Sequence, residues 1–237
     1  MKKFLFLADF HGNLPAAEAM GRYLDTAAVD EIWFLGDAVG KGPSNAETCD
    51  WVRQRCHHYI GGNWDYGIGG REYAGDQYYY DQLGEERMQW LNSLPREAEL
   101  WLSGIRFRLF HGRPLEPLLT QDSDKDALNR LFTVNGEQYG GVIFADSHRP
   151  FFRTHHAGYL MNTGSVGNSM GVTNAHALMI EAEPGTQRAP LTVSIISVPY
   201  DNERAADIAR RDPSLPNQQA YIHEVMTGVY SRVRTDG

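Results

Sequence analysis

Short apolar segments that alternate with helical ones constrain the fold of this chain most. Residues 2–9 and 30–37 carry the apolar runs of buried strands, and residues 14–27 and 44–56 have the pattern of amphipathic helices. Strands and helices that alternate at this spacing are typical of βαβ units, in which both faces of the sheet are covered. The pattern predicts an α/β fold.

Later segments extend this alternation and then change it. Further strands are expected over residues 57–63, 105–112, 141–148 and 159–165. Two long strands over 176–183 and 191–200 then have the spacing of a hairpin, and residues 202–232 have the pattern of an interrupted helix. Residues 66–104 separate two core strands by more than one crossover helix needs, so we expect a small helical cap-like insertion there. We expect residues 1–237 to form a single domain.

Five of the apolar segments end in side chains that can bind a metal ion. In chain order these are Asp9 and His11, Asp37, Asn63, His111, and Asp146 and His148. Ligands of open α/β sheets bind beyond the carboxyl ends of the strands, so these side chains are expected to converge. One such motif alone has ordinary explanations, such as capping a turn or satisfying a core hydrogen bond. Five in succession predict a metal site.

The same motifs resemble those of the calcineurin-like metallophosphoesterases. The matching stretches are DFH at 9–11, GD at 36–37, GNWD at 62–65, HG at 111–112 and ADSH at 145–148. The late VPYD at 198–201 resembles the small bacterial and archaeal members with phosphodiesterase activity. The resemblance implies a metallophosphoesterase-like α/β/β/α sandwich, in which two mixed sheets are flanked by helices.

The resemblance also implies a pair of divalent metal ions. One ion would be held by Asp9, His11, Asp37 and His148, and the other by Asp37, Asn63, His111 and Asp146, with Asp37 bridging. Such a pair clamps a phosphate and lowers the pKa of a shared water, so that a bridging hydroxide attacks phosphorus. Manganese is the expected metal, with iron, zinc, nickel and magnesium as alternatives. The catalytic assignments are Asp37, Asn63, His111 and Arg113, the last because it follows His111 closely and can reach a phosphate oxygen.

Two positions depart from the family pattern. Asp146 stands where the family has a histidine, and its carboxylate favours manganese, iron or magnesium. A third carboxylate also lowers the positive charge of the site, which favours diesters over dianionic monoesters; alternatively, Asp146 makes no metal contact and the second site is weak. Trp64 replaces a histidine that protonates the leaving oxygen, and an indole cannot take that role. His155 and His156 are the candidates for a substitute acid.

Two classes of function follow. The first is a two-metal phosphodiesterase that hydrolyses a small phosphodiester or nucleotide, and the second is a catalytically impaired scaffold of the same fold that binds a protein partner. A formal net charge of −8, from 22 basic and 30 acidic residues, gives no basic stripe for long nucleic acid. No apolar run reaches the roughly 18 residues of a membrane span. We expect a cytoplasmic protein with a small phosphorylated substrate, and leave a homo-oligomer open.

Overall fold

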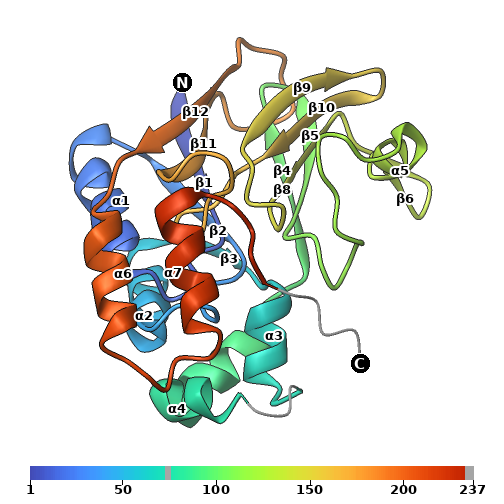
Figure 1. Cartoon of the computed structure of the whole chain (residues 1–237). Helices are drawn as coiled ribbons and strands as arrows, with labels where there is room; N and C mark the ends of the chain where they lie inside the picture. The colour runs from blue at the N-terminus through green and yellow to red at the C-terminus, as the bar shows by residue number, and fades with distance from the viewer. Residues whose placement is uncertain (73–75, 233–237) are drawn as a thin grey trace.

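Two five-stranded mixed sheets pack face to face in this chain, and helices flank them (Figure 1). The computed structural model describes residues 1–72 and 76–232. The first sheet contains β1 (Lys2–Leu7), β2 (Glu31–Leu35), β3 (His58–Ile60), β11 (Ala175–Ala182) and β12 (Thr192–Val198). The second contains β4 (Glu97–Leu102), β5 (Ile105–Phe110), β8 (Gly141–Phe144), β9 (Phe151–His155) and β10 (Gly158–Asn162). This architecture confirms the predicted two-sheet sandwich.

Each sheet contains three neighbouring parallel strands. The strand orders are β12-β11-β1-β2-β3 and β4-β5-β8-β10-β9. β1, β2 and β3 pair in parallel, as do β5, β8 and β10. β11 and β12 form the antiparallel hairpin that the sequence predicted. The loops that follow the parallel strands of both sheets carry the candidate site.

The core explains why the first strand has four apolar residues in a row, Phe4 to Leu7. Phe4 and Phe6 of β1 face the second sheet and pack among residues of that sheet, including Phe107. Leu5 and Leu7 face the opposite way, toward the helices. These four side chains are at most 1% exposed. Burying each side chain of this size stabilises the fold by roughly 1.5–3 kcal/mol, so both faces of the strand contribute.

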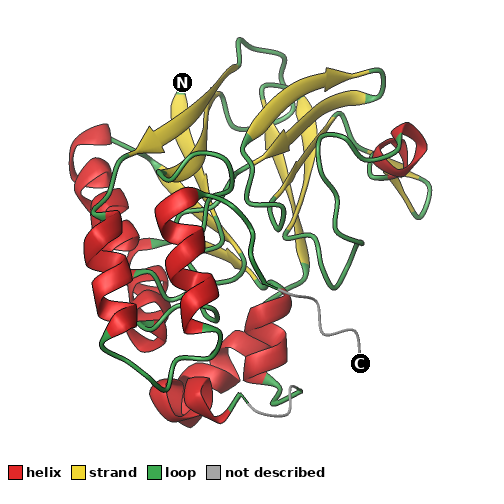
Figure 2. Ribbon diagram, viewed as in Figure 1, coloured by secondary structure: helices red, strands yellow, loops and turns green. Residues whose placement is uncertain are grey.

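Helices cover the outer face of the first sheet and extend below it (Figure 2). They are α1 (Leu14–Ala27), α2 (Asn45–Arg55), α3 (Asn63–Gly69), α4 (Gln77–Asn92), α6 (Asn202–Arg210) and α7 (Gln218–Thr227). The second sheet carries the short α5 (Lys125–Arg130) and the small hairpin of β6 (Thr133–Val134) and β7 (Glu137–Gln138) on its outer side. None of the described helices is both long and apolar enough to cross a membrane.

The segment that we expected to form an insertion, residues 66–104, contributes to two helices and to one strand of the second sheet. Residues 66–104 contain most of α3, all of α4, which is kinked at Gly84, and β4, while residues 73–75 lie outside the described residues. β4 pairs antiparallel with β5. Its alternate residues Ala98, Leu100 and Leu102 pack against the core between the sheets, as expected for a half-buried edge strand. The division of the chain into domains stays a prediction.

Candidate metal centre

The side chains predicted from both sheets meet at one point. Asp9 follows β1, Asp37 follows β2 and His111 follows β5. Nε2 of His111 lies 3.3 Å from Oδ2 of Asp37 and 3.8 Å from Oδ1 of Asp9. These three residues are at most 2% exposed. The parallel strands therefore bring carboxylates and an imidazole into one buried cluster, as the sequence predicted.

A second group of ligand atoms lies beside the first. Nε2 of His148 is 3.4 Å from Oδ1 of Asp9, and Nε2 of His11 is 3.7 Å from the same oxygen. Asp9 thus belongs to both groups: with His11 and His148 in one, and with Asp37 and His111 in the other. Asp37 also lies 3.6 Å from Nε2 of His11. Asp9 therefore connects the two groups, and the bridging role of Asp37 stays a prediction.

The three histidines of the cluster are oriented alike. Each Nδ1 contacts a backbone carbonyl: His11 that of Val39 at 3.1 Å, His111 that of Leu35 at 2.7 Å, and His148 that of Asn168 at 2.6 Å. A carbonyl oxygen only accepts, so each Nδ1 donates its proton and each Nε2 turns a lone pair toward the cluster. Histidines that bind metals usually have their second nitrogen fixed in this way.

The backbone at this edge is held in a conformation that side chains seldom adopt. Asp9, His11, Asp37, Asp146 and His148 have φ values of 57°, 47°, 60°, 62° and 58°. A residue other than glycine held there costs about 1–3 kcal/mol, and such positions concentrate at functional sites. Stability alone would favour other residues at these positions. Their presence indicates that the loops are shaped to aim particular side chains.

Several polar atoms of the cluster are buried without a hydrogen bond. Within the described ranges, they include both carboxylate oxygens of Asp9, Oδ1 of Asn63 and Nε2 of His111. Buried polar atoms almost always have a partner, so this gap requires an explanation. Carboxylate, amide oxygen and imidazole nitrogen together form a suitable ligand set for divalent first-row metals. The residues present therefore fit the metal ions that the family resemblance implied.

The protonation states of His11 and His148 agree with this fit. Burial lowers the pKa of His11 and of His148 well below the ordinary value, with the Lys41 ammonium as a further cause. Both imidazoles are therefore neutral at physiological pH, which is the form that binds metal. Burial raises the pKa of Asp9, because the carboxylate has lost its hydration. A cation bound beside Asp9 would offset that cost.

Asp65, the last residue of the GNWD motif, is a positioning residue. Its buried carboxylate accepts hydrogen bonds from the backbone N–H groups of Asp37 at 2.7 Å, Ala38 at 2.9 Å and Gly62 at 3.0 Å. It thereby ties the loop after β2 to the loop after β3. Burial raises the pKa of Asp65 to about 7. Its place in the GNWD motif was the sequence feature that could have indicated this role.

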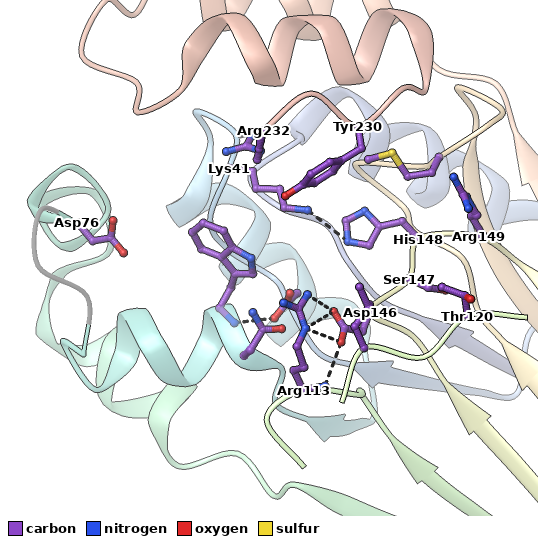
Figure 3. Close-up of a pocket in the computed structure, with 15 residues that line it drawn as sticks. Lys41, Asp76, Arg113, Thr120, Asp146, Ser147, His148, Arg149, Tyr230 and Arg232 are labelled. Atoms are coloured by element: carbon purple, nitrogen blue, oxygen red, sulfur yellow. Dashed lines mark hydrogen bonds and ion pairs between the residues drawn. The ribbon is translucent and has the colours of Figure 1, made fainter. Parts of the chain in front are cut away.

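Asp146 has a partner that the sequence did not reveal. The guanidinium of Arg113 contacts both of its carboxylate oxygens, and the backbone N–H of Arg113 donates to Oδ2 at 3.1 Å (Figure 3). Burial alone would raise the pKa of Asp146, but the bonds from Arg113 lower it to about 2. Arg113 also offsets the extra negative charge, so the argument from that charge toward diesters does not hold. Metal contact by Asp146 and phosphate contact by Arg113 stay predictions.

A cavity of about 690 Å³ opens onto the cluster. Asp37, Asn63 and His148 line its polar side, while Trp64 and Tyr230 contribute aromatic walls. The Trp64 ring stands edge-on to the ring of His11, 6.0 Å away. Trp64 therefore covers the metal cluster from one side. The tyrosines of α4 pack against the core, where Tyr79 is 1% exposed and Tyr78 and Tyr80 are partly buried.

The histidines considered as substitute acids lie elsewhere. His155 belongs to β9 and stacks on Phe132 at 5.9 Å, and His156 stacks against His155. Neither histidine is among the residues that line the cavity. The hypothesis that one of them replaces the missing acid is therefore not supported by their placement.

Two buried charged residues, Lys41 and Glu224, were not singled out from the sequence. Lys41 follows β2, and its Nζ lies 3.3 Å from Nε2 of His148. Burial lowers the pKa of Lys41 to about 8, with Arg232 as the next cause. Glu224 of α7 is fully buried and contacts both Asn168 and Arg232. The only sequence signals were a lysine in a glycine-rich loop and an acidic residue in a helix.

Comparison with known proteins identifies the class. The family model of the calcineurin-like phosphoesterase superfamily domain matches residues 2–185. The chain belongs to this superfamily, which supports a metal-dependent phosphoesterase.

Individual proteins are similar to this chain over most of its length. The chain is 27% identical over 227 residues to the uncharacterized protein MJ0912 of Methanocaldococcus jannaschii, and the match covers 84% of this chain and 88% of that protein. The crystal structure of a metallophosphoesterase from Sphaerobacter thermophilus matches with a TM-score of 0.74 and 26% identity, over 96% of this chain and 99% of that one. The hypothetical protein PH1004 from Pyrococcus horikoshii OT3 shares the fold, with a TM-score of 0.78 and 20% identity over 98% and 100% of the two chains.

Proposed function

We propose that this chain is a two-metal phosphodiesterase that hydrolyses a small phosphodiester or nucleotide. The observation that carries the proposal is the set of buried ligand atoms of Asp9, Asn63 and His111 that have no hydrogen-bond partner among the described residues. Metal ions would give these atoms partners. Two divalent ions, when bound, would polarise a phosphate and acidify a water.

Manganese and iron are the metals that this ligand set favours. Asp9 and Asp37 supply hard carboxylate oxygens, and Asn63 adds an amide oxygen. His11, His111 and His148 supply imidazole nitrogens, and no described cysteine lies in the cluster. Oxygen ligands suit manganese and magnesium, while imidazole suits iron, zinc and nickel. A mixed set lies between the two preferences, which favours manganese or iron.

The walls of the cavity support an organic substituent on the phosphate. Trp64, Leu118, Met170 and Tyr230 line it together with the cationic side chains of Lys41, Arg113 and Arg232. Cavities of roughly 300–1,000 Å³ hold small ligands, and apolar walls with a few polar groups are typical of them. The cations are suited to hold phosphate oxygens, while the aromatic walls exclude water beside the ester group.

The proposed reaction proceeds without a titrating group at position 64. The indole of Trp64 can donate a hydrogen bond but does not titrate near neutral pH, so it cannot act as a general acid. The leaving oxygen must therefore depart as an anion or take its proton from water. This favours phosphodiesters whose leaving groups are acidic.

The alternative is a scaffold of the same fold that binds a protein partner. A scaffold has no use for buried donors without hydrogen bonds, nor for the strained backbone at Asp9 and Asp37. Elemental analysis of the purified protein and a manganese-supplemented assay on bis(p-nitrophenyl) phosphate distinguish the two functions. The phosphodiesterase should bind two ions per chain and turn over, and Asp37→Asn should lose most of this activity. Asp25→Asn, at an exposed surface ion pair, is the matched control. Absence of both metal and turnover would favour the scaffold.

A further inference from the structure

Residues 228–232 follow α7 and form part of the cavity wall (Figure 3). Tyr230 and Arg232 of this segment line the cavity. The backbone N–H of Ser231 donates to Oε1 of Glu224 on α7 at 3.4 Å. The hydroxyl of Ser231 donates to a backbone carbonyl of the same helix at 3.2 Å. The segment is therefore fastened to α7 beside the cavity.

Glu224 also holds the guanidinium of Arg232 in place. The glutamate is fully buried, and its Oε2 accepts from Nε of Arg232 at 3.2 Å and from Nδ2 of Asn168 at 3.1 Å. The backbone carbonyl of Asn168 in turn accepts from Nδ1 of His148 at 2.6 Å. Two residues thus connect Arg232 to the metal cluster. The guanidinium is fixed relative to the place where a phosphate would be cleaved.

Most of this guanidinium has no hydrogen-bond partner. The side chain of Arg232 is 10% exposed. The bond from Nε is the only hydrogen bond of its guanidinium in the described part of the chain, and Nη2 is buried without an acceptor. The two terminal nitrogens carry most of the N–H donors of an arginine. Buried donors almost always have an acceptor, so this gap indicates a ligand.

The charge of this wall also favours an anionic ligand. Lys41 is a second buried cation that lines the same cavity. Burial, followed by the charge of Arg232, lowers the pKa of Lys41 to about 8. Glu224 is the one carboxylate in ion-pair contact with Arg232 within residues 1–72 and 76–232. Two cations therefore accompany one carboxylate at this wall.

We propose that Arg232 is a specificity-determining residue that binds a second anionic group of the substrate. The inference rests on the proposed phosphoesterase function, in which the first anionic group is the phosphate at the metal cluster. Phosphate and carboxylate oxygens only accept hydrogen bonds, and a guanidinium presents paired donors to them. Arg113 lines the cavity too, but it already binds Asp146 through two nitrogens. The substrate class is a phosphoester whose organic part carries a further phosphate or carboxylate.

Phosphonates with one and with two anionic groups are the probes, because their C–P bonds resist hydrolysis. Calorimetry on manganese-loaded protein measures the affinity of propylphosphonate and of a series of alkylene diphosphonates of increasing length. In the wild type, the diphosphonate of matching length should bind about 10- to 100-fold more tightly than propylphosphonate, since it gains a charge-assisted contact. Phosphonocarboxylates of the same lengths show whether a carboxylate binds equally well.

Arg232→Gln tests the residue itself. The variant should lose most of the preference for the diphosphonate and bind propylphosphonate as the wild type does. An arginine that only neutralises Glu224 would lower the melting temperature without changing this ratio of affinities. Should Arg232→Gln fail to fold, the double variant Arg232→Gln with Glu224→Gln removes both buried charges together and carries the same expectation. Arg55→Gln, at an exposed surface ion pair, is the matched control.

The outcomes separate this inference from the proposed function. Diphosphonates that bind the wild type no better than propylphosphonate overturn the role of Arg232, as does a preference that survives in the variants. In both cases binding of manganese and of propylphosphonate still supports the metal centre. A wild type that binds no manganese contradicts the proposed function and, with it, this inference.

Discussion

The carboxylate of Asp146 lies in a bidentate ion pair with the guanidinium of Arg113. Nη2 of Arg113 is 2.6 Å from Oδ1 of Asp146, and Nε is 2.9 Å from Oδ2. Nε2 of His111 lies 4.0 Å from the same Oδ1. The arginine therefore holds the carboxylate at the border of the metal cluster, where it competes with any cation for the same oxygens.

Releasing Asp146 should strengthen the second metal site. In Arg113→Gln the carboxylate loses its bidentate partner and becomes available to an ion held by Asp37 and His111. We expect the weaker of the two manganese affinities to rise about 10-fold, since charge-assisted hydrogen bonds are worth roughly 1.5–3 kcal/mol. Calorimetric titration of metal-free protein measures this. Arg106→Gln, at a surface ion pair near the start of β5, is the control. A weakened second site would contradict the expectation.

Asp65 should stabilise both the fold and the metal loops. Asp65→Ala leaves three buried backbone N–H groups without an acceptor, so we expect the free energy of unfolding to fall by about 3 kcal/mol or more. Manganese affinity should fall too, because Asp37 loses its backbone support. Urea unfolding and metal titration test the two effects, with the exposed Asp25→Ala as control. Unfolding at the wild-type urea concentration would refute the positioning role.

The ion pair between α2 and α4 predicts a pH dependence of stability. Arg87 donates to both carboxylate oxygens of Asp50, and its hydrogen bonds lower the pKa of Asp50 below the ordinary 3.8. A carboxylate with a lowered folded-state pKa stabilises the fold above pH 3.8, and this contribution is lost as pH falls through the folded pKa. Because both side chains are about one-third exposed, Asp50→Asn should cost at most about 1 kcal/mol at pH 7.

Thermal melts of wild type and Asp50→Asn from pH 7 down to pH 2 measure this difference. The two proteins should converge as the pH drops below about 3.8. Since neither side chain lies at the metal cluster, the comparison can be made without metal. A gap between the melting temperatures that stays constant down to pH 2 would show that Asp50 stabilises the fold by another route.

Trp64 predicts a preference for acidic leaving groups. Proton transfer to the leaving oxygen contributes roughly 10²- to 10⁴-fold in rate, and an alkyl diester needs that proton more than an aryl one. We expect aryl phosphodiesters to be cleaved much faster than alkyl ones. Trp64→His should raise the alkyl rate more than the aryl rate. Equal kcat/KM for both substrate types in the wild type would rule this explanation out.

The sequence was sufficient to predict most strands of the two sheets and the convergence of the main metal-ligand side chains. An apolar run in β1 that ends at Asp9, and the equivalent ends at Asp37 and His111, place side chains at one edge through strand geometry alone. This regularity does not depend on which rotamer each side chain adopts. For that reason the structure brings together the donors expected from these strand ends.

Other features depend on partners distant in the chain. Asp146 pairs with Arg113 from a different loop, and Asn168 joins Lys41 to Glu224 on the last helix. Side-chain choices of this kind follow from three-dimensional packing and leave no periodic pattern. β4 was missed because its alternating polar residues lie within a segment that otherwise resembles a helical insertion. Edge strands that are half exposed have the weakest sequence pattern.

The most direct test of the account is a crystal structure of the protein grown with Mn²⁺, with anomalous scattering recorded at the manganese edge. We expect two adjacent manganese peaks. One should lie among Asp9, His11 and His148, and the other among Asp37, Asn63 and His111. The absence of any manganese peak at this cluster, at manganese concentrations that saturate related sites, would contradict the proposed two-metal phosphodiesterase.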